Sequence, residues 1–285
     1  MRGSARGFSG GERRALAYEV SGDGDPVLLI AGTGMPASAW ELHGAPTLRD
    51  AGYRVITFDN RGTGDSDGPP GPYTVTEMAA DTAGLLEHVG CGTALVVGLS
   101  LGGSIAQELA RTRPDLVSAM VLWVGVGRSP AFFRMLQAAE RDIASLVPVP
   151  ASWHLAEYLL ISLPFDSLQK DDALVEAVAE IIDAGVSWSG DGRAGQFSAD
   201  VAWDSADHAD LYPQIGCPCL VVAHELDLIY PPHGARAAAN AMVRGSFLEI
   251  PGVAHGQTLQ AAPAVVPAII DFLAALSATR SRRAP

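Results

Sequence analysis

The sequence has few cysteines and few positive charges, and each shortage excludes a class of protein. Only three cysteines occur among 285 residues, Cys91, Cys217 and Cys219, and such a sparse, odd set does not form the disulfide framework of a small secreted domain. Lys and Arg number 19 against 32 Asp and Glu, which gives a formal net charge of −13. A field of that sign repels phosphate backbones and anionic membrane surfaces. We therefore expect neither nucleic acid nor a membrane as a partner.

Targeting segments and metal-ligand clusters are also lacking. Residues 1–20 hold four arginines, four glycines and no apolar core of a signal peptide, and no later stretch approaches 18 uncharged apolar residues. We therefore expect a soluble, cytoplasmic protein. No cluster of His, Cys and acidic residues has the spacing of metal ligands, and Cys217-Pro218-Cys219 is too short to chelate zinc with both thiols. We expect no metal and no cofactor.

What the chain does have is enough apolar sequence for one large core, because 48% of its residues are apolar and only 18% are charged. Six short, mostly continuous apolar runs end in Gly, Asp, His or Pro: residues 27–30, 55–58, 94–97, 120–124, 220–223 and 246–250. Such runs are typical of strands that are buried on both faces of a parallel sheet. Residues 14–20 alternate weakly and lead into the turn cluster 21–26, which predicts an opening antiparallel hairpin.

Helical patterns lie between these runs, at residues 76–89, 103–112, 234–243 and 263–276. The alternation predicts an α/β fold with an open, doubly wound, mostly parallel sheet. From about residue 127 to 211 the alternation stops, and only helical stretches follow one another: 132–146, 151–161 and 172–184. We therefore predict a helical cap inserted between core strands. The expected division is a first core segment 1–127, a cap 128–211 and a second core segment 212–285.

A glycine-flanked serine follows the third of the apolar runs. The run 94–97 leads into Gly98-Leu99-Ser100-Leu101-Gly102 and then a helical stretch, which is the G-x-S-x-G pattern in a strand-turn-helix context. A nucleophile on so tight a turn needs small residues on both sides, because a Cβ would collide with the backbone. The first N–H groups of the helix, beginning with that of Leu101, point at the site and stabilise an oxyanion. The alternative is an ordinary serine in a Gly-rich turn.

A serine nucleophile needs a histidine base that is held by a carboxylate, and in this arrangement the acid precedes the histidine in the chain. Asp227 follows the run 220–223 and His255 follows the run 246–250. Both therefore come at the carboxyl ends of strands, the edge of the sheet where Ser100 also lies. We predict Asp227 as the acid and His255 as the base. The competing residues are Glu225 and His224, while helical, surface or cap positions are expected for the other histidines: His43, His88, His154, His208 and His233.

With these residues the chain resembles the α/β-hydrolase superfamily from about residue 12 to 276, and within it the small bacterial esterases, lactonases, perhydrolases and anthracycline methylesterases. In that family a His-Gly-x pattern follows the first parallel strand, and its third residue donates the second N–H group of the oxyanion hole. Here Ala31-Gly32-Thr33 stands at that place. The resemblance therefore implies that Thr33 is the donor, while Ala31 replaces the usual histidine. It also implies a purely structural role for the turn Asp59-Asn60-Arg61-Gly62-Thr63-Gly64-Asp65-Ser66.

Three of the five tryptophans fall in the predicted cap. Because aromatic side chains line concave sites, we predict a largely apolar substrate pocket between cap and core, lined by Met35, Trp153, Tyr158, Trp188 and Trp203. The alternative is that the tryptophans only pack the cap helices. A pocket of this kind suits a medium-sized, largely apolar ester, lactone or thioester.

The sequence thus predicts a serine hydrolase that works through an acyl-enzyme on a small-molecule substrate, with the N–H groups of Thr33 and Leu101 as its oxyanion hole. Two other functions use the same residues. One is a lyase or cyclase of a biosynthetic pathway, in which the triad performs elimination or proton transfer. The other is a small-molecule receptor, because a fold by itself does not determine a function. A homo-oligomer is compatible with the sequence.

Overall fold

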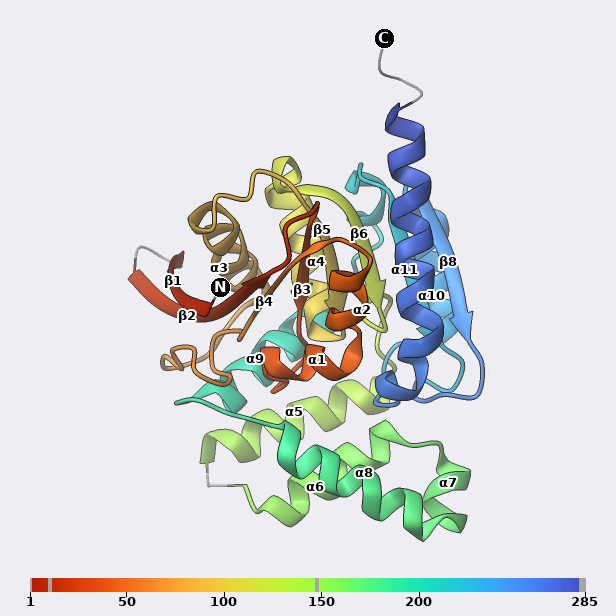
Figure 1. The fold of residues 1–285 in the computed structure, drawn as a ribbon. Helices are drawn as coiled ribbons and strands as arrows, with labels where there is room; N and C mark the ends of the chain where they lie inside the picture. The colour runs from red at the N-terminus through yellow and green to blue at the C-terminus, as the bar shows by residue number, and fades with distance from the viewer. Residues whose placement is uncertain (1, 10–11, 147–148, 282–285) are drawn as a thin grey trace.

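A computed structural model describes residues 2–9, 12–146 and 149–281, and in it the chain forms an eight-stranded sheet with helices on both faces (Figure 1). The order of the strands in the sheet is β1-β2-β4-β3-β5-β6-β7-β8. Their bounds are β1 (Arg2–Ser9), β2 (Glu12–Ser21), β3 (Pro26–Ile30), β4 (Arg54–Phe58), β5 (Ala94–Leu99), β6 (Val117–Trp123), β7 (Cys219–His224) and β8 (Gly245–Ile250).

The sheet is mostly parallel, which confirms the predicted architecture. Strands β3 to β8 pair parallel with one another, whereas β2 pairs antiparallel with β1 and with β4. The predicted opening hairpin is wrong, because β3 does not pair with β2: β4 lies between them, with Tyr18 opposite Phe58 on one side and Leu28 opposite Ile56 on the other. This order places the apolar strand β3 between two parallel neighbours, β4 and β5, inside the sheet.

The described helices connect the strands and cover the sheet. Their bounds are α1 (Trp40–His43), α2 (Ala45–Asp50), α3 (Val75–His88), α4 (Leu101–Thr112), α5 (Ala131–Leu146), α6 (Ala151–Ser162), α7 (Phe165–Lys170), α8 (Asp172–Gly185), α9 (Gly192–Ser205), α10 (Pro232–Ala241) and α11 (Thr258–Ser281). Successive side chains of a strand point to opposite faces of a sheet. Each buried strand therefore contributes apolar side chains to two clusters, one on each face. One cluster joins the sheet to α3, α4 and α10, and the other joins it to α1, α2 and α11.

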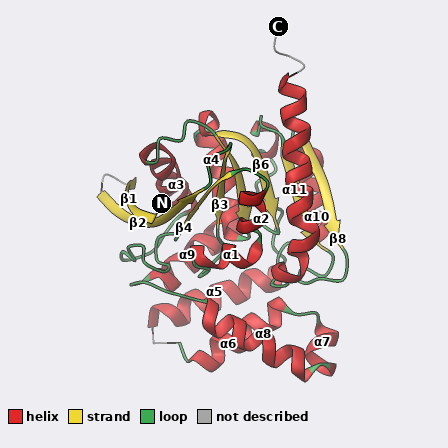
Figure 2. Ribbon diagram, viewed as in Figure 1, coloured by secondary structure: helices red, strands yellow, loops and turns green. Residues whose placement is uncertain are grey.

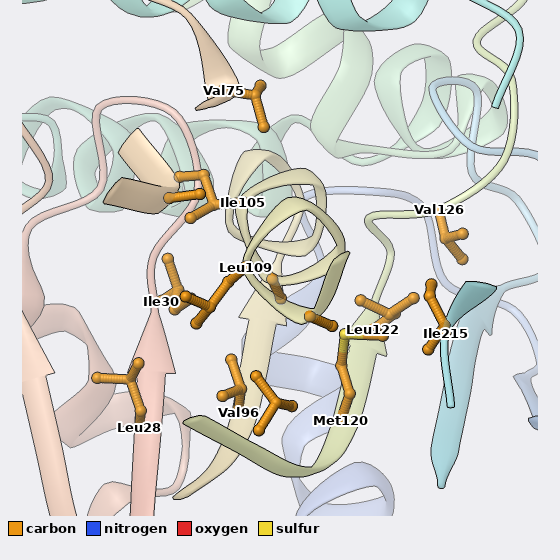
Figure 3. Packing of buried hydrophobic residues seen from close by; sticks show 14 of the residues in the cluster. Leu28, Ile30, Val75, Val96, Ile105, Leu109, Met120, Leu122, Val126 and Ile215 are labelled. Carbon is orange, nitrogen blue, oxygen red and sulfur yellow. The ribbon is translucent and has the colours of Figure 1, made fainter. Parts of the chain in front are cut away.

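Figure 3 shows part of the first cluster. Ile105 and Leu109 of α4 lie over Val96 and Leu122 of the central strands, and all four side chains are inaccessible to solvent. The centre of the sheet is therefore covered by the helix that follows Ser100. Burial of this kind contributes roughly 1.5–3 kcal/mol for each large apolar side chain, which stabilises β5 and α4 on either side of Ser100.

Helix α11 differs from the sequence prediction, which found no stretch suited to a membrane. Its residues Thr258–Leu276, with a mean hydropathy of 1.8, are long and apolar enough to cross a membrane by length and composition alone. In this fold one side of the helix packs on the sheet, where Val265 and Val266 are buried beside Val97. Of this stretch, 28% is buried inside the fold. A mostly buried core helix of a soluble protein and a signal sequence meet the same criteria of length and composition.

Helices α5 to α9 lie between β6 and β7, in the interval where the sequence predicts a cap, and we call residues 131–205 the helical insertion. The described part of this segment contains no strand, and α5, α6, α7 and α8 lie together at one end of the sheet (Figures 1 and 2). Helices α7 and α9 were not among the helical stretches expected from the sequence. The insertion lies over the edge of the sheet at which β3, β5, β7 and β8 end. Residues that follow these strands and residues of the insertion line the same cavity.

Candidate active site

Ser100 occupies a strained turn between β5 and α4. Its backbone angles are φ 53° and ψ −120°, a backbone conformation that residues other than glycine rarely adopt. Two glycines allow the turn: a Cβ on Gly98 would lie 2.2 Å from the carbonyl oxygen of Gly102, and a Cβ on Gly102 would lie 2.2 Å from that of Ile30. The turn presents the Ser100 side chain to the cavity at the end of the sheet.

The structure brings the three predicted catalytic side chains together from three separate loops. Nε2 of His255 lies 3.0 Å from Oγ of Ser100, and Nδ1 of His255 lies 2.9 Å from Oδ2 of Asp227. Asp227 is 3% exposed, and its Oδ1 accepts the backbone N–H groups of Ile229 and Tyr230 at 2.7 and 2.9 Å. This arrangement lets His255 accept the Ser100 proton while the carboxylate fixes the imidazole.

The two competing residues have other positions. The Glu225 side chain is exposed and accepts the N–H of Gly252 at 2.8 Å. His224 is inaccessible to solvent, accepts the indole N–H of Trp123 at Nε2 (2.9 Å), and has Nδ1 2.8 Å from the carbonyl oxygen of Ala254. Burial lowers the pKa of His224 to about 4. His224 is therefore a neutral side chain whose Nδ1–H supports the residue before His255.

His43 is also placed differently from the sequence prediction of a helical or surface side chain exposed to water. It lies in α1 but is 9% exposed and lines the cavity. Its Nδ1 lies 2.8 Å from the carbonyl oxygen of Ala39, and its Nε2 lies 2.7 Å from Oγ1 of Thr258. Burial lowers its pKa. The helix spans only residues 40–43, so no helical periodicity in the sequence indicates its buried side.

A cavity of about 460 Å³ opens beside Ser100 and His255, between the sheet and the helical insertion. Most of its walls are apolar, and they include Leu42, Phe133, Ile161, Ile182 and Ile229. Of the five predicted pocket residues, Met35 and Tyr158 line it. The described lining residues include no Lys or Arg. Its volume of about 460 Å³ lies within the range of small-molecule binding sites.

The three tryptophans of the insertion are not among the residues that line this cavity. Trp153 is 45% exposed, and its indole N–H donates to Glu140. Trp188 covers Gly34 from outside the cavity, so that a Cβ on Gly34 would lie 2.7 Å from its ring. Trp203 stacks on His208, with ring centroids 3.9 Å apart. These tryptophans therefore pack the insertion on itself and on the core, and they do not line the cavity.

The two predicted oxyanion donors flank Ser100. Gly32 lies against it, since a Cβ on Gly32 would be 3.3 Å from Cβ of Ser100, and the next residue, Thr33, lines the cavity. Leu101 begins α4, and the first N–H groups of a helix have no acceptor within the helix. The side chain of Thr33 donates to Oδ2 of Asp200 at 2.8 Å.

Two carboxyl groups in the cavity wall were missed by the sequence analysis. Burial, together with the charge of Glu140, raises the pKa of Glu157 to about 8. Burial, together with the charge of Asp204, raises the pKa of Asp200 well above its usual value. Both shifts favour the protonated form of the carboxyl group. The spacing of Gln196, Asp200 and Asp204, each four residues apart, places three polar residues on one side of α9 and is the sequence pattern that reveals this polar face.

Among residues 2–9, 12–146 and 149–281, no group of three or more His, Cys, Asp and Glu side chains is arranged to hold a metal ion.

Comparisons with known proteins identify the family of this chain. A family model described as the alpha/beta hydrolase family matches residues 27–268. The putative non-heme bromoperoxidase BpoC of Mycobacterium tuberculosis is 35% identical over 265 residues, which cover 92% of this chain and 99% of that protein. Its crystal structure is similar to this one with a TM-score of 0.83, at 34% identity over 91% of this chain and 96% of that chain.

Two further relatives carry hydrolytic names. Rhodomycin D methylesterase DnrP of Streptomyces peucetius is 29% identical over 259 residues, covering 82% of this chain and 86% of that protein. A thermophilic esterase from Thermogutta terrifontis, solved with malate bound, has a TM-score of 0.80 at 27% identity and covers 96% of this chain and 98% of its own. The chain belongs to the alpha/beta hydrolase family and has its fold. The family and these relatives support a hydrolase function.

Proposed function

We propose that this protein is a serine hydrolase that cleaves a medium-sized, largely apolar ester, lactone or thioester. The observation that carries the proposal is the pair of distances from His255, 3.0 Å to Oγ of Ser100 and 2.9 Å to Oδ2 of Asp227, at the wall of a mostly apolar cavity. A hydroxyl, an imidazole and a carboxylate in this order are the groups that acyl transfer to water requires.

In the proposed reaction His255 takes the proton of Ser100 as the hydroxyl attacks the carbonyl carbon of the substrate. The charge that develops on the carbonyl oxygen is stabilised by the N–H groups of Thr33 and Leu101 and by the dipole of α4. His255 then gives its proton to the leaving group, and an acyl-enzyme on Ser100 remains. Water, activated by the same imidazole, hydrolyses it and restores the hydroxyl. Asp227 orients the imidazole and stabilises its cationic form.

The walls of the cavity support the choice of substrate. Their aliphatic and aromatic side chains favour an apolar acyl or alcohol group, and the described lining offers no Lys or Arg to hold a strongly anionic metabolite. Two of the relatives reported above are a methylesterase and an esterase by name. An uncharged carboxylic ester is the substrate that fits both lines of support.

Labelling with a fluorophosphonate tests the proposed nucleophile. We expect intact-mass analysis to find one adduct on the wild-type chain and none on Ser100→Ala. The same variant should lose about 10⁴- to 10⁶-fold in turnover on the best member of an ester, lactone and thioester panel. A folded wild-type protein without an adduct, or a Ser100→Ala variant with most of the activity, would reject the covalent mechanism.

Two further readouts separate hydrolysis from the other functions that the same residues could serve. Hydrolysis in water enriched in oxygen-18 places the label in the released acid, whereas elimination by cleavage of the C–O bond incorporates none. A receptor would bind a small molecule tightly without turnover. Rapid multiple turnover with labelled acid as the product is the outcome that we expect.

A further inference from the structure

The loop that carries Thr33 is held mainly from outside the sheet. The peptide unit between Thr33 and Gly34 is bonded at both of its polar groups by the helical insertion. The hydroxyl of Tyr158, on α6, donates to the carbonyl oxygen of Thr33 at 2.8 Å. The N–H of Gly34 donates to Oε1 of Gln196, on α9, at 2.9 Å. A peptide unit that is held at its C=O and at its N–H cannot rotate without losing both hydrogen bonds.

Three more contacts from the same insertion surround these two residues. The Thr33 hydroxyl donates to Oδ2 of Asp200, on α9, at 2.8 Å. The N–H of Ser187 donates to the carbonyl oxygen of Gly34 at 3.2 Å, and the ring of Trp188 lies against Gly34. The insertion therefore contacts the backbone and the side chain of this segment from several directions.

Two further hydrogen bonds hold the start of this loop, one from the core and one within the loop itself. The side-chain amide of Asn60 donates to the carbonyl oxygen of Ala31 at 3.0 Å, and the carbonyl oxygen of Gly32 accepts the N–H of Met35 at 3.2 Å. Gly32 lacks a Cβ and so has a wide choice of backbone angles. The peptide unit that carries the Thr33 N–H is therefore held at its carbonyl by Met35, inside the loop, and the next peptide unit, between Thr33 and Gly34, is held by the insertion. The direction of the Thr33 N–H depends on both.

We propose that Tyr158 and Asp200 are positioning residues of the oxyanion hole: from the helical insertion they fix the carbonyl and the hydroxyl of Thr33, and so aim its N–H at the oxyanion. This inference rests on the proposed function. It means that the insertion, besides enclosing the substrate, completes the catalytic machinery. The donor is correctly aimed only while the insertion is seated on the loop, so substrate enclosure and oxyanion stabilisation are coupled.

Removing one hydroxyl tests the role of Tyr158. Tyr158→Phe keeps the ring in the cavity wall and removes only the hydrogen bond to Thr33. Tyr73→Phe is the matched control, because the hydroxyl of the buried Tyr73 also donates to a backbone carbonyl, that of Pro69 at 2.6 Å, away from the cavity. We expect Tyr158→Phe to lower kcat and the rate of fluorophosphonate labelling about tenfold, and Tyr73→Phe to leave both within about twofold of the wild type.

A pair of inhibitors separates positioning from a loss of packing. An alkyl trifluoromethyl ketone adds to a serine and forms an oxyanion, whereas the matching secondary alcohol only fills the cavity. For Tyr158→Phe we expect the inhibition constant of the ketone to rise about tenfold and that of the alcohol to stay within about twofold. Equal changes for ketone and alcohol, or no change for either, would overturn the inference.

Asp200 is tested by rescue. Asp200→Ala removes the acceptor of the Thr33 hydroxyl and should weaken the ketone by about fivefold to tenfold. Asp200→Asn keeps a carbonyl oxygen in the same place and should restore most of the affinity. Thr33→Val should reproduce the effect of Asp200→Ala, and the two changes together should cost no more than either alone. Additive losses would show that the two residues act separately and would contradict the inference.

The same experiments separate this inference from the proposed function. If the wild-type protein forms no adduct at Ser100 and binds ketone and alcohol equally, the proposed function fails and the inference falls with it. If the wild-type protein is labelled and prefers the ketone, while Tyr158→Phe and Asp200→Ala behave like the wild type, only the inference fails.

Discussion

Asp227 faces His255 with one carboxylate oxygen and the protein backbone with the other. Its Oδ2 lies 2.9 Å from Nδ1 of His255, and its Oδ1 accepts the N–H groups of Ile229 and Tyr230. Because Oδ1 is occupied by two donors, the carboxylate cannot rotate, and Oδ2 accepts the Nδ1–H of the imidazole. Nε2 of His255 is then left as the proton acceptor that faces Ser100.

Replacing this carboxylate by an amide should reverse the tautomer of His255. In Asp227→Asn the side-chain oxygen keeps the two backbone N–H donors and the NH₂ group turns toward Nδ1, so that the proton of the imidazole moves to Nε2. We expect kcat to fall by about 10³- to 10⁴-fold with little change in folding. Glu225→Gln is the control, because this nearby carboxylate bonds the N–H of Gly252 instead. Steady-state kinetics compare the two variants, and a similar loss in both would contradict the assignment of the acid.

The turn at Ser100 should tolerate no side chain at its first glycine. The added Cβ of Gly98→Ala would lie 2.2 Å from the carbonyl oxygen of Gly102, so the backbone of the turn must move. We expect a loss of at least about 2 kcal/mol in the free energy of unfolding, and fluorophosphonate labelling that is slower than in the wild type. Gly216→Ala is the control, since an added Cβ there meets no atom within 4 Å. Urea unfolding of both variants measures the difference, and equal stabilities would argue against the collision.

Acid should weaken the protein through His224. The unfolded chain takes up this proton near pH 6.5 and the folded chain only near pH 4, so between these values the unfolded state binds more protons and a fall in pH favours unfolding. The advantage in stability of the wild type over His224→Asn should therefore shrink as the pH falls from 7 to 4, by on the order of 2 kcal/mol. Urea unfolding at both values measures it. The exposed His88, changed to Asn, is the control, and the prediction fails if both variants show the same pH dependence.

Alkali should weaken the protein through Glu157. Its carboxyl group titrates near pH 4.5 in the unfolded chain and near pH 8 in the folded one. Between these values the folded state holds the extra proton, so a rise in pH favours unfolding. The stability of the wild type relative to Glu157→Gln should fall between pH 5 and pH 8, whereas the exposed Glu176→Gln should show no such trend. Urea unfolding at the two pH values provides the comparison, and a constant difference for Glu157→Gln would contradict a buried neutral acid.

The elements of the core could be read from the sequence with small errors at their ends. The run 94–97 becomes β5 (Ala94–Leu99), and the helical pattern 103–112 becomes α4 (Leu101–Thr112). Buried parallel strands are predictable because both of their faces must be apolar, which leaves a continuous run in the sequence. The order of the strands was less accessible: the turn after residue 21 resembles that of a hairpin, but β4 separates β2 from β3.

The lining of the cavity could not be read in the same way. Composition indicates that the insertion is aromatic, yet the side on which each aromatic residue lies depends on how the helices are rotated. Trp153 bonds Glu140, whereas Tyr158, five residues later on the same helix, reaches Thr33. Local patterns do not fix such rotations, because they arise from the packing of helices that are distant in the sequence.

The sequence by itself determined the family, the mostly parallel sheet and the identity of the candidate site residues Ser100, Asp227 and His255, because a tight turn and the ends of parallel strands impose residue types at fixed local positions. Only the tertiary structure decided what surrounds them. The carboxyl groups of Glu157 and Asp200 have raised pKa values, His224 supports the loop of His255, and the insertion bonds Thr33. Each of these features depends on segments far apart in the chain. Their protonation and hydrogen bonding follow from burial among these segments, a property that no local stretch of sequence contains.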